Sequence, residues 1–100
     1  AGITIVDLTS AQKAMQYGVS ITGVYIQEVT GENAKMAGLK AGDLIYYVDD
    51  VKITDSSTLL NTIQSHQVGD TVEFTIVRDN EIKKFNVKLQ DSQEASGKNN

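Results

Sequence analysis

Peptide hydrolysis is the first chemistry to consider, because a histidine follows several serines in this chain. His66 is the only histidine, and Ser56, Ser57 and Ser65 precede it closely. A serine nucleophile needs a base beside it, often on a sharp G-x-S-x-G turn, and none of these serines has that surrounding sequence. Two of the serines suit a helix start, and a protonated histidine suits a helix C-terminus. We therefore assign no catalytic residue.

Metal and phosphate binding are the next possibilities. Asp49, Asp50 and Asp55 form a local acidic group, but the glycine and the closing glutamate of a calcium loop are missing. The glycine-rich stretch 38–42 contains neither GK[ST] nor GxGxxG, and its glycines suit a tight turn with positive φ. We assign these residues to turns and predict no metal ion and no cofactor.

Composition limits the partners. The 100-residue chain has a formal net charge of −4 and an estimated pI of 4.8, so it repels phosphate backbones, and we expect no nucleic-acid partner. The adjacent Tyr46 and Tyr47 then fit a strand better than a base-stacking surface. No apolar run is long enough to cross a membrane, so we expect no direct membrane insertion. The absence of cysteine excludes disulfides and is compatible with an extracytoplasmic location.

The elements that must position any site follow from hydrophobic periodicity and turn signals. They suggest about five strands and two principal helices, which would form a small, partly open β-barrel capped by helices. Strands are predicted at Ile3–Leu8, Gly23–Val29, Asp43–Val48, 71–78 and 81–89, with a further short strand or bridge at Val51–Ile53. Helices are predicted after Ser10 and after Asp55 or Ser56, with a single helical turn at Ala34–Ala37.

The two ends of the chain differ in character. Residues 90–100 contain almost no apolar side chains, so we predict a domain at 1–89 followed by a disordered tail. At the other end, a strand-like pattern begins within two residues of the terminus. We therefore expect the chain to be cut from a longer protein.

One stretch of the sequence narrows the range of possible folds. Residues 23–55, GVYIQEVTGENAKMAGLKAGDLIYYVDDVKITD, resemble the centre of a PDZ domain, with AGLKAGDLI and VDDVKI as the most specific parts. The element order, with the groove strand first and FNVKL last, resembles the circularly permuted PDZ domains of bacterial HtrA/Deg-type serine proteases over nearly all of residues 2–89. The resemblance implies an α+β, mainly β fold: a PDZ-like, partly open barrel or sandwich of five to six strands, capped by two helices.

The resemblance also implies a peptide site. In PDZ domains an extended peptide adds to a sheet edge beside a helix. The family's carboxylate-binding motif falls at Gly2-Ile3, preceded by Ala1. Strand alternation independently places Ile3 and Ile5 on one face, and helical spacing lets Leu60 and Ile63 share a face while Leu59 turns to the core. Ordinary core packing remains the alternative. The predicted peptide-binding residues are Ala1, Gly2, Ile3, Thr4, Ile5, Leu60, Ile63 and Gln64.

These resemblances predict a peptide-binding module rather than an enzyme. The expected partners are peptide or unfolded-protein C-termini with an apolar last residue, and a protease domain in the same polypeptide. The parent is expected to be an extracytoplasmic serine endopeptidase that the module regulates or targets. The alternatives are the PDZ module of another protease class (tail-specific, Lon-like or site-2 metalloprotease) and a scaffold without a protease.

Overall fold

The computed structural model describes residues 2–19, 21–67 and 69–89 of the chain. The predicted disordered tail and the predicted site residue Ala1 lie outside this range. The elements follow one another as β1 (Ile3–Leu8), α1 (Ala11–Gln16), β2 (Gly23–Val29), α2 (Glu32–Ala37), β3 (Leu44–Val48), β4 (Val51–Lys52), α3 (Ser56–Gln64), β5 (Thr71–Arg78) and β6 (Glu81–Lys88).

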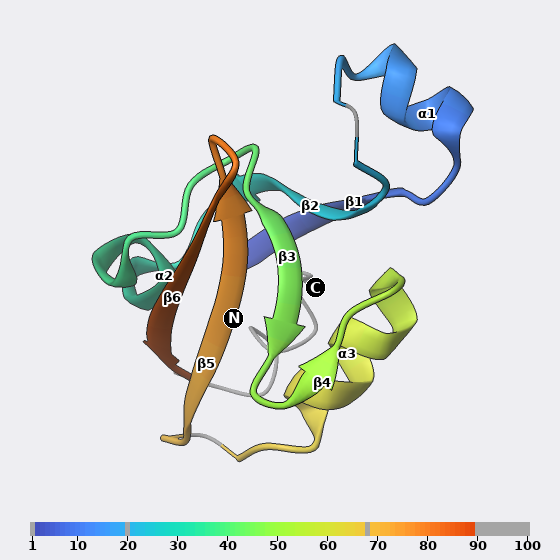
Figure 1. The fold of residues 1–100 in the computed structure, drawn as a ribbon. Coiled ribbons are helices and arrows are strands. Elements are labelled where there is room, and N and C mark those ends of the chain that lie inside the picture. The colour runs from blue at the N-terminus through green and yellow to red at the C-terminus, as the bar shows by residue number, and fades with distance from the viewer. Residues whose placement is uncertain (1, 20, 68, 90–100) are drawn as a thin grey trace.

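The strands form one antiparallel sheet in the order β1-β2-β3-β5-β6, and β4 pairs with β3. This open, mainly β arrangement confirms the predicted fold class. The helices differ in detail from the expectation. The structure describes three helices, and α2 is longer than the single turn predicted. α1 stands away from the sheet at the far end of β1 and β2, whereas α2 and α3 lie against the body of the domain (Figure 1).

Local sequence signals explain several of these boundaries. The Ser10 hydroxyl accepts a hydrogen bond from the Lys13 amide at the start of α1. The Asp55 carboxylate accepts one from the Thr58 amide at the start of α3. Such side chains satisfy amide groups that have no partner within the helix. The β5–β6 hairpin turns where the backbone has two consecutive positive φ angles, 53° at Asp79 and 65° at Asn80, as a tight hairpin turn requires.

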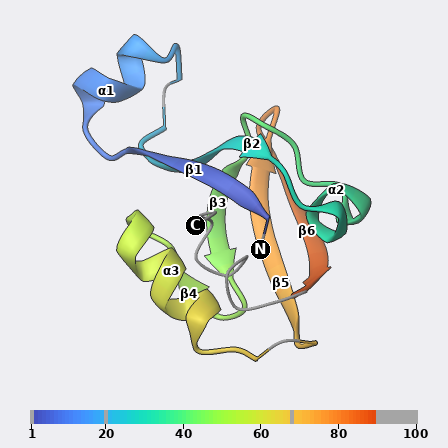
Figure 2. The same ribbon diagram turned by 180° about the vertical axis from the view of Figure 1, so that it is seen from behind.

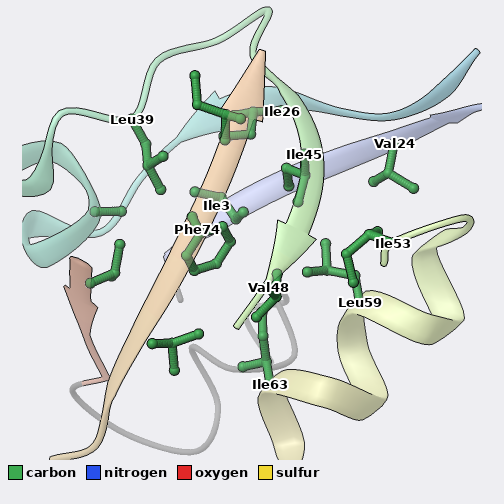
Figure 3. Close-up of a cluster of buried hydrophobic side chains, with 14 of the residues drawn as sticks. Ile3, Val24, Ile26, Leu39, Ile45, Val48, Ile53, Leu59, Ile63 and Phe74 are labelled. Atoms are coloured by element: carbon green, nitrogen blue, oxygen red, sulfur yellow. The ribbon is translucent and has the colours of Figure 1, made fainter. Parts of the chain in front are cut away.

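The main core lies between the sheet and α3. On β5, Val72, Phe74 and Ile76 are completely buried, as the predicted alternation requires, and Thr75 between them is buried as well. Figure 3 shows Leu59 and Ile63 extending from α3 toward the strands. A second, smaller cluster on the other face of the sheet contains Leu8, Tyr25 and Leu44. Tyr25 therefore belongs to a buried face that the sequence pattern did not reveal.

Candidate functional site

The candidate site is the free side of β1 together with the neighbouring face of α3, which we call the β1–α3 edge. β1 ends the order of strands and pairs with β2 on one side; within the described ranges no strand pairs with its other side. α3 contacts β1, and Figure 2 shows the helix below this strand on the left of the view. An unpaired strand side carries free backbone donors and acceptors, so this edge can accept an added strand.

Gly2 fixes the start of the edge. Its φ is 76°, and its carbonyl oxygen accepts hydrogen bonds of 2.7 Å from both the Thr30 and the Gly31 amides. A Cβ atom at Gly2 would lie 2.5 Å from the Cα atom of Gly31, closer than real contacts allow. The family resemblance explains this glycine by a backbone that bends closely around a carboxylate. The structure adds a further reason, which is close packing against the turn between β2 and α2.

The β1 side chains alternate as predicted. Ile3 is buried in the main core, and Ile5 is partly buried and packs against the same cluster. The Thr4 hydroxyl instead donates a hydrogen bond of 3.4 Å to the Glu28 carbonyl oxygen on β2. Val6 packs against the second cluster, on the opposite face. Ile3 and Ile5 therefore share the face toward the main core.

On α3 the assignment of faces needs a correction. Leu59 and Ile63 are both buried in the core with 1% exposure, whereas Leu60 is partly buried and Gln64 is exposed. Ile63 thus groups with Leu59, not with Leu60. The physical reason is that residues four apart lie closer in angle around a helix than residues three apart. Leu60 and Gln64 remain on the accessible flank of α3.

Sequence reasoning missed two polar residues at the other end of this edge. The Ser56 hydroxyl, in the first turn of α3, donates a 2.7 Å hydrogen bond to Oδ2 of Asp7 on β1. The other carboxylate oxygen of Asp7, Oδ1, is buried and has no hydrogen-bond partner within the described part of the chain. The available signal was the alternation itself, because Asp7 follows Ile3 and Ile5 on the same face of the strand.

The AGLKAGD stretch, residues 37–43, forms a hydrogen-bond network inside the domain, away from the β1–α3 edge. Asp43 has 2% exposure, and the Arg78 guanidinium donates to both of its carboxylate oxygens at 2.8 and 2.7 Å. The Lys40 amide donates to the same carboxylate, and Arg78 also donates to the Gly38 carbonyl oxygen. The hydrogen bonds to Asp43 raise the pKa of Arg78 above its ordinary value. This network joins the loop before β3 to the β5–β6 hairpin.

Comparison with known proteins decides the family. The family model described as PDZ domain matches residues 2–89. The chain is a PDZ domain. It is 40% identical over 97 residues to a serine protease Do-like HtrA from Lactococcus lactis subsp. cremoris, an alignment that covers 91% of the chain. The PDZ domain spans about a quarter of that relative's length, 24%.

Solved structures show the same fold. An HtrA-type protease AlgW with decapeptide has a TM-score of 0.80 at 19% identity, covering 89% of this chain and 28% of that one. The HtrA3 PDZ domain bound to a phage-derived ligand, FGRWV, has a TM-score of 0.72 at 24% identity, covering 87% of this chain and 80% of that one.

Two further relatives are described as proteases of different classes. One is a putative zinc metalloprotease from Thermotoga maritima, 36% identical over 69 residues, which cover 69% of this chain and 13% of that protein. The other is a probable periplasmic serine endoprotease DegP-like from Ectopseudomonas mendocina, 29% identical over 89 residues, which cover 88% of this chain and 18% of that protein.

The histidine considered above as a possible base has structural contacts in this PDZ domain. His66 Nε2 lies 2.9 Å from Oδ2 of Asp49, and Nδ1 lies 3.6 Å from Oδ2 of Asp70. Asp49 also accepts a hydrogen bond from the Glu73 amide. His66 thus connects the end of α3 to the β3–β4 turn, and through Asp49 to β5.

Over residues 2–19, 21–67 and 69–89, no group of three or more histidine, aspartate or glutamate side chains is placed to hold a metal ion. No helix in the described part of the chain has the length and apolar character needed to span a membrane.

Proposed function

We propose that this PDZ domain binds the C-terminal segment of another polypeptide as an added antiparallel strand along residues Ile3–Val6. The observation that carries the proposal is the open side of β1 beside α3, in a chain that matches the PDZ family over residues 2–89. Strand addition gives affinity through the backbone, and neighbouring side chains give specificity. The peptides named with the similar AlgW and HtrA3 structures support this mode of use.

An apolar last residue of the ligand would contact the apolar side chains of the β1–α3 edge, chiefly Ile5 and Leu60, which are both partly buried in the free domain. Burying such a side chain contributes roughly 1.5–3 kcal/mol. Each strand-type hydrogen bond adds about 0.5–1.5 kcal/mol net. The cost of association offsets much of this, so we expect an affinity in the micromolar range or weaker, about −8 kcal/mol at best.

We further propose that the domain regulates or targets an HtrA-type serine protease carried in the same polypeptide, outside the cytoplasm. The support is the 40% identity to the Lactococcus protein and the more distant likeness to the DegP-like protein. In this proposal the chain itself performs no hydrolysis, and His66 serves to link α3 to Asp49 and Asp70.

A second candidate is the PDZ module of a metalloprotease, which the 36% identity to the Thermotoga protein favours. The sequence of the parent protein separates the two candidates. A trypsin-like region with a serine motif supports the first, whereas H-E-x-x-H within membrane helices supports the second.

Labelled peptides titrated by fluorescence anisotropy test the peptide proposal. We expect a peptide with a free C-terminal carboxylate and a valine as its last residue to bind about tenfold more tightly than its C-terminal amide, because the bound anion gains charge-assisted hydrogen bonds. We expect Leu60→Ala to weaken binding roughly fivefold, since it removes apolar contact area. Ile63→Asp is a poor test, because Ile63 is a core residue and its replacement by a charge would unfold the domain.

Ile82→Ala is the matched control for Leu60→Ala. Ile82 is 64% exposed and lies on β6, the other edge strand of the sheet. Binding should be unchanged in this variant, and hydrogen exchange at the β1 amides should slow when peptide is added. Equal affinity of the acid and the amide, or loss of binding in Ile82→Ala but not in Leu60→Ala, contradicts the proposal.

A further inference from the structure

Asp7 is the chemically unusual residue of the β1–α3 edge. It follows two isoleucines, Ile3 and Ile5, on the same face of β1, yet it carries a charge. Its side chain is partly buried; Oδ2 accepts the 2.7 Å hydrogen bond from Ser56, and Oδ1 is buried without a hydrogen-bond partner in the described residues. Buried carboxylate oxygens normally have donors, so this atom marks a place where a donor is missing.

Among the described residues no further donor is directed at Asp7, so an additional donor would come from the open side of β1. On the other side of the strand Asp7 is paired with Val24 of β2. Ser56 has one hydroxyl proton, which is already directed at Oδ2. The nearby carboxylate of Asp55 has no proton to give and is itself used as the helix cap. Asp7 as a whole is only partly buried, so a donor that approaches along the open side of β1 can contact its side chain.

An added strand brings a ligand side chain to this place. In an antiparallel pair, residues directly opposite one another point to the same face of the sheet. If the last residue of the ligand lies opposite Ile3, the residue opposite Asp7 is the fourth before the last. Its side chain then lies beside Asp7, next to the first turn of α3.

The electrostatics at this point favour a cation. The chain has a net charge of −4, and Asp55 adds a second carboxylate next to Ser56. The Asp7 carboxylate lies next to the first turn of α3, where Ser56 holds it in place. The same molecule shows what satisfies a shielded carboxylate, because the Arg78 guanidinium contacts both oxygens of Asp43. A planar guanidinium matches a carboxylate better than an ammonium does.

We propose that Asp7, positioned by Ser56, selects ligands that carry arginine four residues before the C-terminus. This inference rests on the proposed function, because it requires a peptide added to β1. It adds a second specificity position, which is charged. This position lies at the end of the β1–α3 edge opposite to the end that receives the apolar last residue of the ligand.

A double-mutant cycle on the folded domain tests the assignment. Three peptides, identical except for arginine, citrulline or glutamate at this position, are titrated against the natural chain and against Asp7→Asn. Citrulline and asparagine keep the shape of arginine and aspartate without the charge. We expect the natural chain to bind the arginine peptide about tenfold more tightly than the citrulline peptide and to bind the glutamate peptide most weakly. In Asp7→Asn the ratio of arginine to citrulline affinities should fall below about twofold.

Several results would overturn the inference. One is equal binding of the arginine and citrulline peptides by the natural chain; another is an unchanged ratio in Asp7→Asn. A uniform loss of affinity for all three peptides in Asp7→Asn would show a structural role for Asp7 instead. If Leu60→Ala and C-terminal amidation still weaken binding in these cases, only the inference about Asp7 fails and the proposed function stands. If neither change matters, or if no peptide binds, the proposed function fails as well.

Discussion

Two aspartates of this PDZ domain hold carboxylate oxygens away from water, and their partners differ greatly. Asp43 receives hydrogen bonds from two nitrogens of Arg78 and from the Lys40 amide, so both of its oxygens are satisfied. Asp7 receives one hydrogen bond, from Ser56, and its second oxygen has no partner in the described residues. A satisfied buried carboxylate stabilises the fold that surrounds it, whereas an incompletely satisfied one leaves capacity for a ligand.

Replacing each aspartate by asparagine is the most direct test of this difference. Asp43→Asn removes the charge partner of Arg78, and we expect it to lower the free energy of unfolding by about 3 kcal/mol. Asp7→Asn should change it by less than about 1 kcal/mol, because the asparagine carbonyl oxygen can still accept the hydrogen bond from Ser56 and a poorly satisfied charge is removed. Urea denaturation followed by circular dichroism measures both. Equal destabilisation by the two substitutions would refute the distinction.

Adding a Cβ atom at Gly2 tests how closely the backbone is packed at the start of the β1–α3 edge. We expect Gly2→Ala to destabilise the domain by about 2 kcal/mol, because an added Cβ atom meets the backbone of Gly31 at a positive φ. Gly18→Ala is the matched control. Its φ of 75° is nearly the same as that of Gly2, but nothing lies within 4 Å of the added atom. It should cost about 1 kcal/mol. Thermal unfolding measures both effects. Equal decreases in the midpoint temperature of the two variants would show that the contact with Gly31 is unimportant.

The smallest expected effect concerns a third carboxylate, Asp55, which is exposed but has partners. Hydrogen bonds from the Thr58 amide and hydroxyl lower its pKa below the ordinary value of 3.8. A lowered pKa in the folded state stabilises the domain above the unfolded-state pKa, and this stabilisation disappears as the pH falls through the folded-state pKa. Asp55→Asn keeps a helix cap but does not titrate.

Measuring the free energy of unfolding of the natural chain and of Asp55→Asn from pH 6 down to pH 2 tests this expectation. The advantage of the natural chain over the variant should shrink below a pH of about 3.8. A difference that stays constant over this range would show that the hydrogen bonds from Thr58 do not depend on the charge of Asp55.

The strand and helix segments could be predicted well because their determinants are local. Alternation located β1 and β5, the serine and aspartate caps located the starts of α1 and α3, and Asp79-Asn80 located the hairpin turn. The candidate site was predicted less completely. Leu60 and Gln64 lie on an accessible flank, but Ile63 proved to be a core residue, and the predictions for Ala1 and the tail lie outside the described residues.

By itself, the sequence determined the order and type of most elements and the family resemblance. These features depend on periodicity and on short motifs, which act between residues close together in the chain. Only the tertiary structure decided which distant residues meet. It brought Ser56 to Asp7, Arg78 to Asp43 and Gly31 to Gly2, pairs separated by many residues. Such contacts depend on how strands and helices pack in three dimensions, and that packing decides which buried carboxylate receives enough partners and which does not.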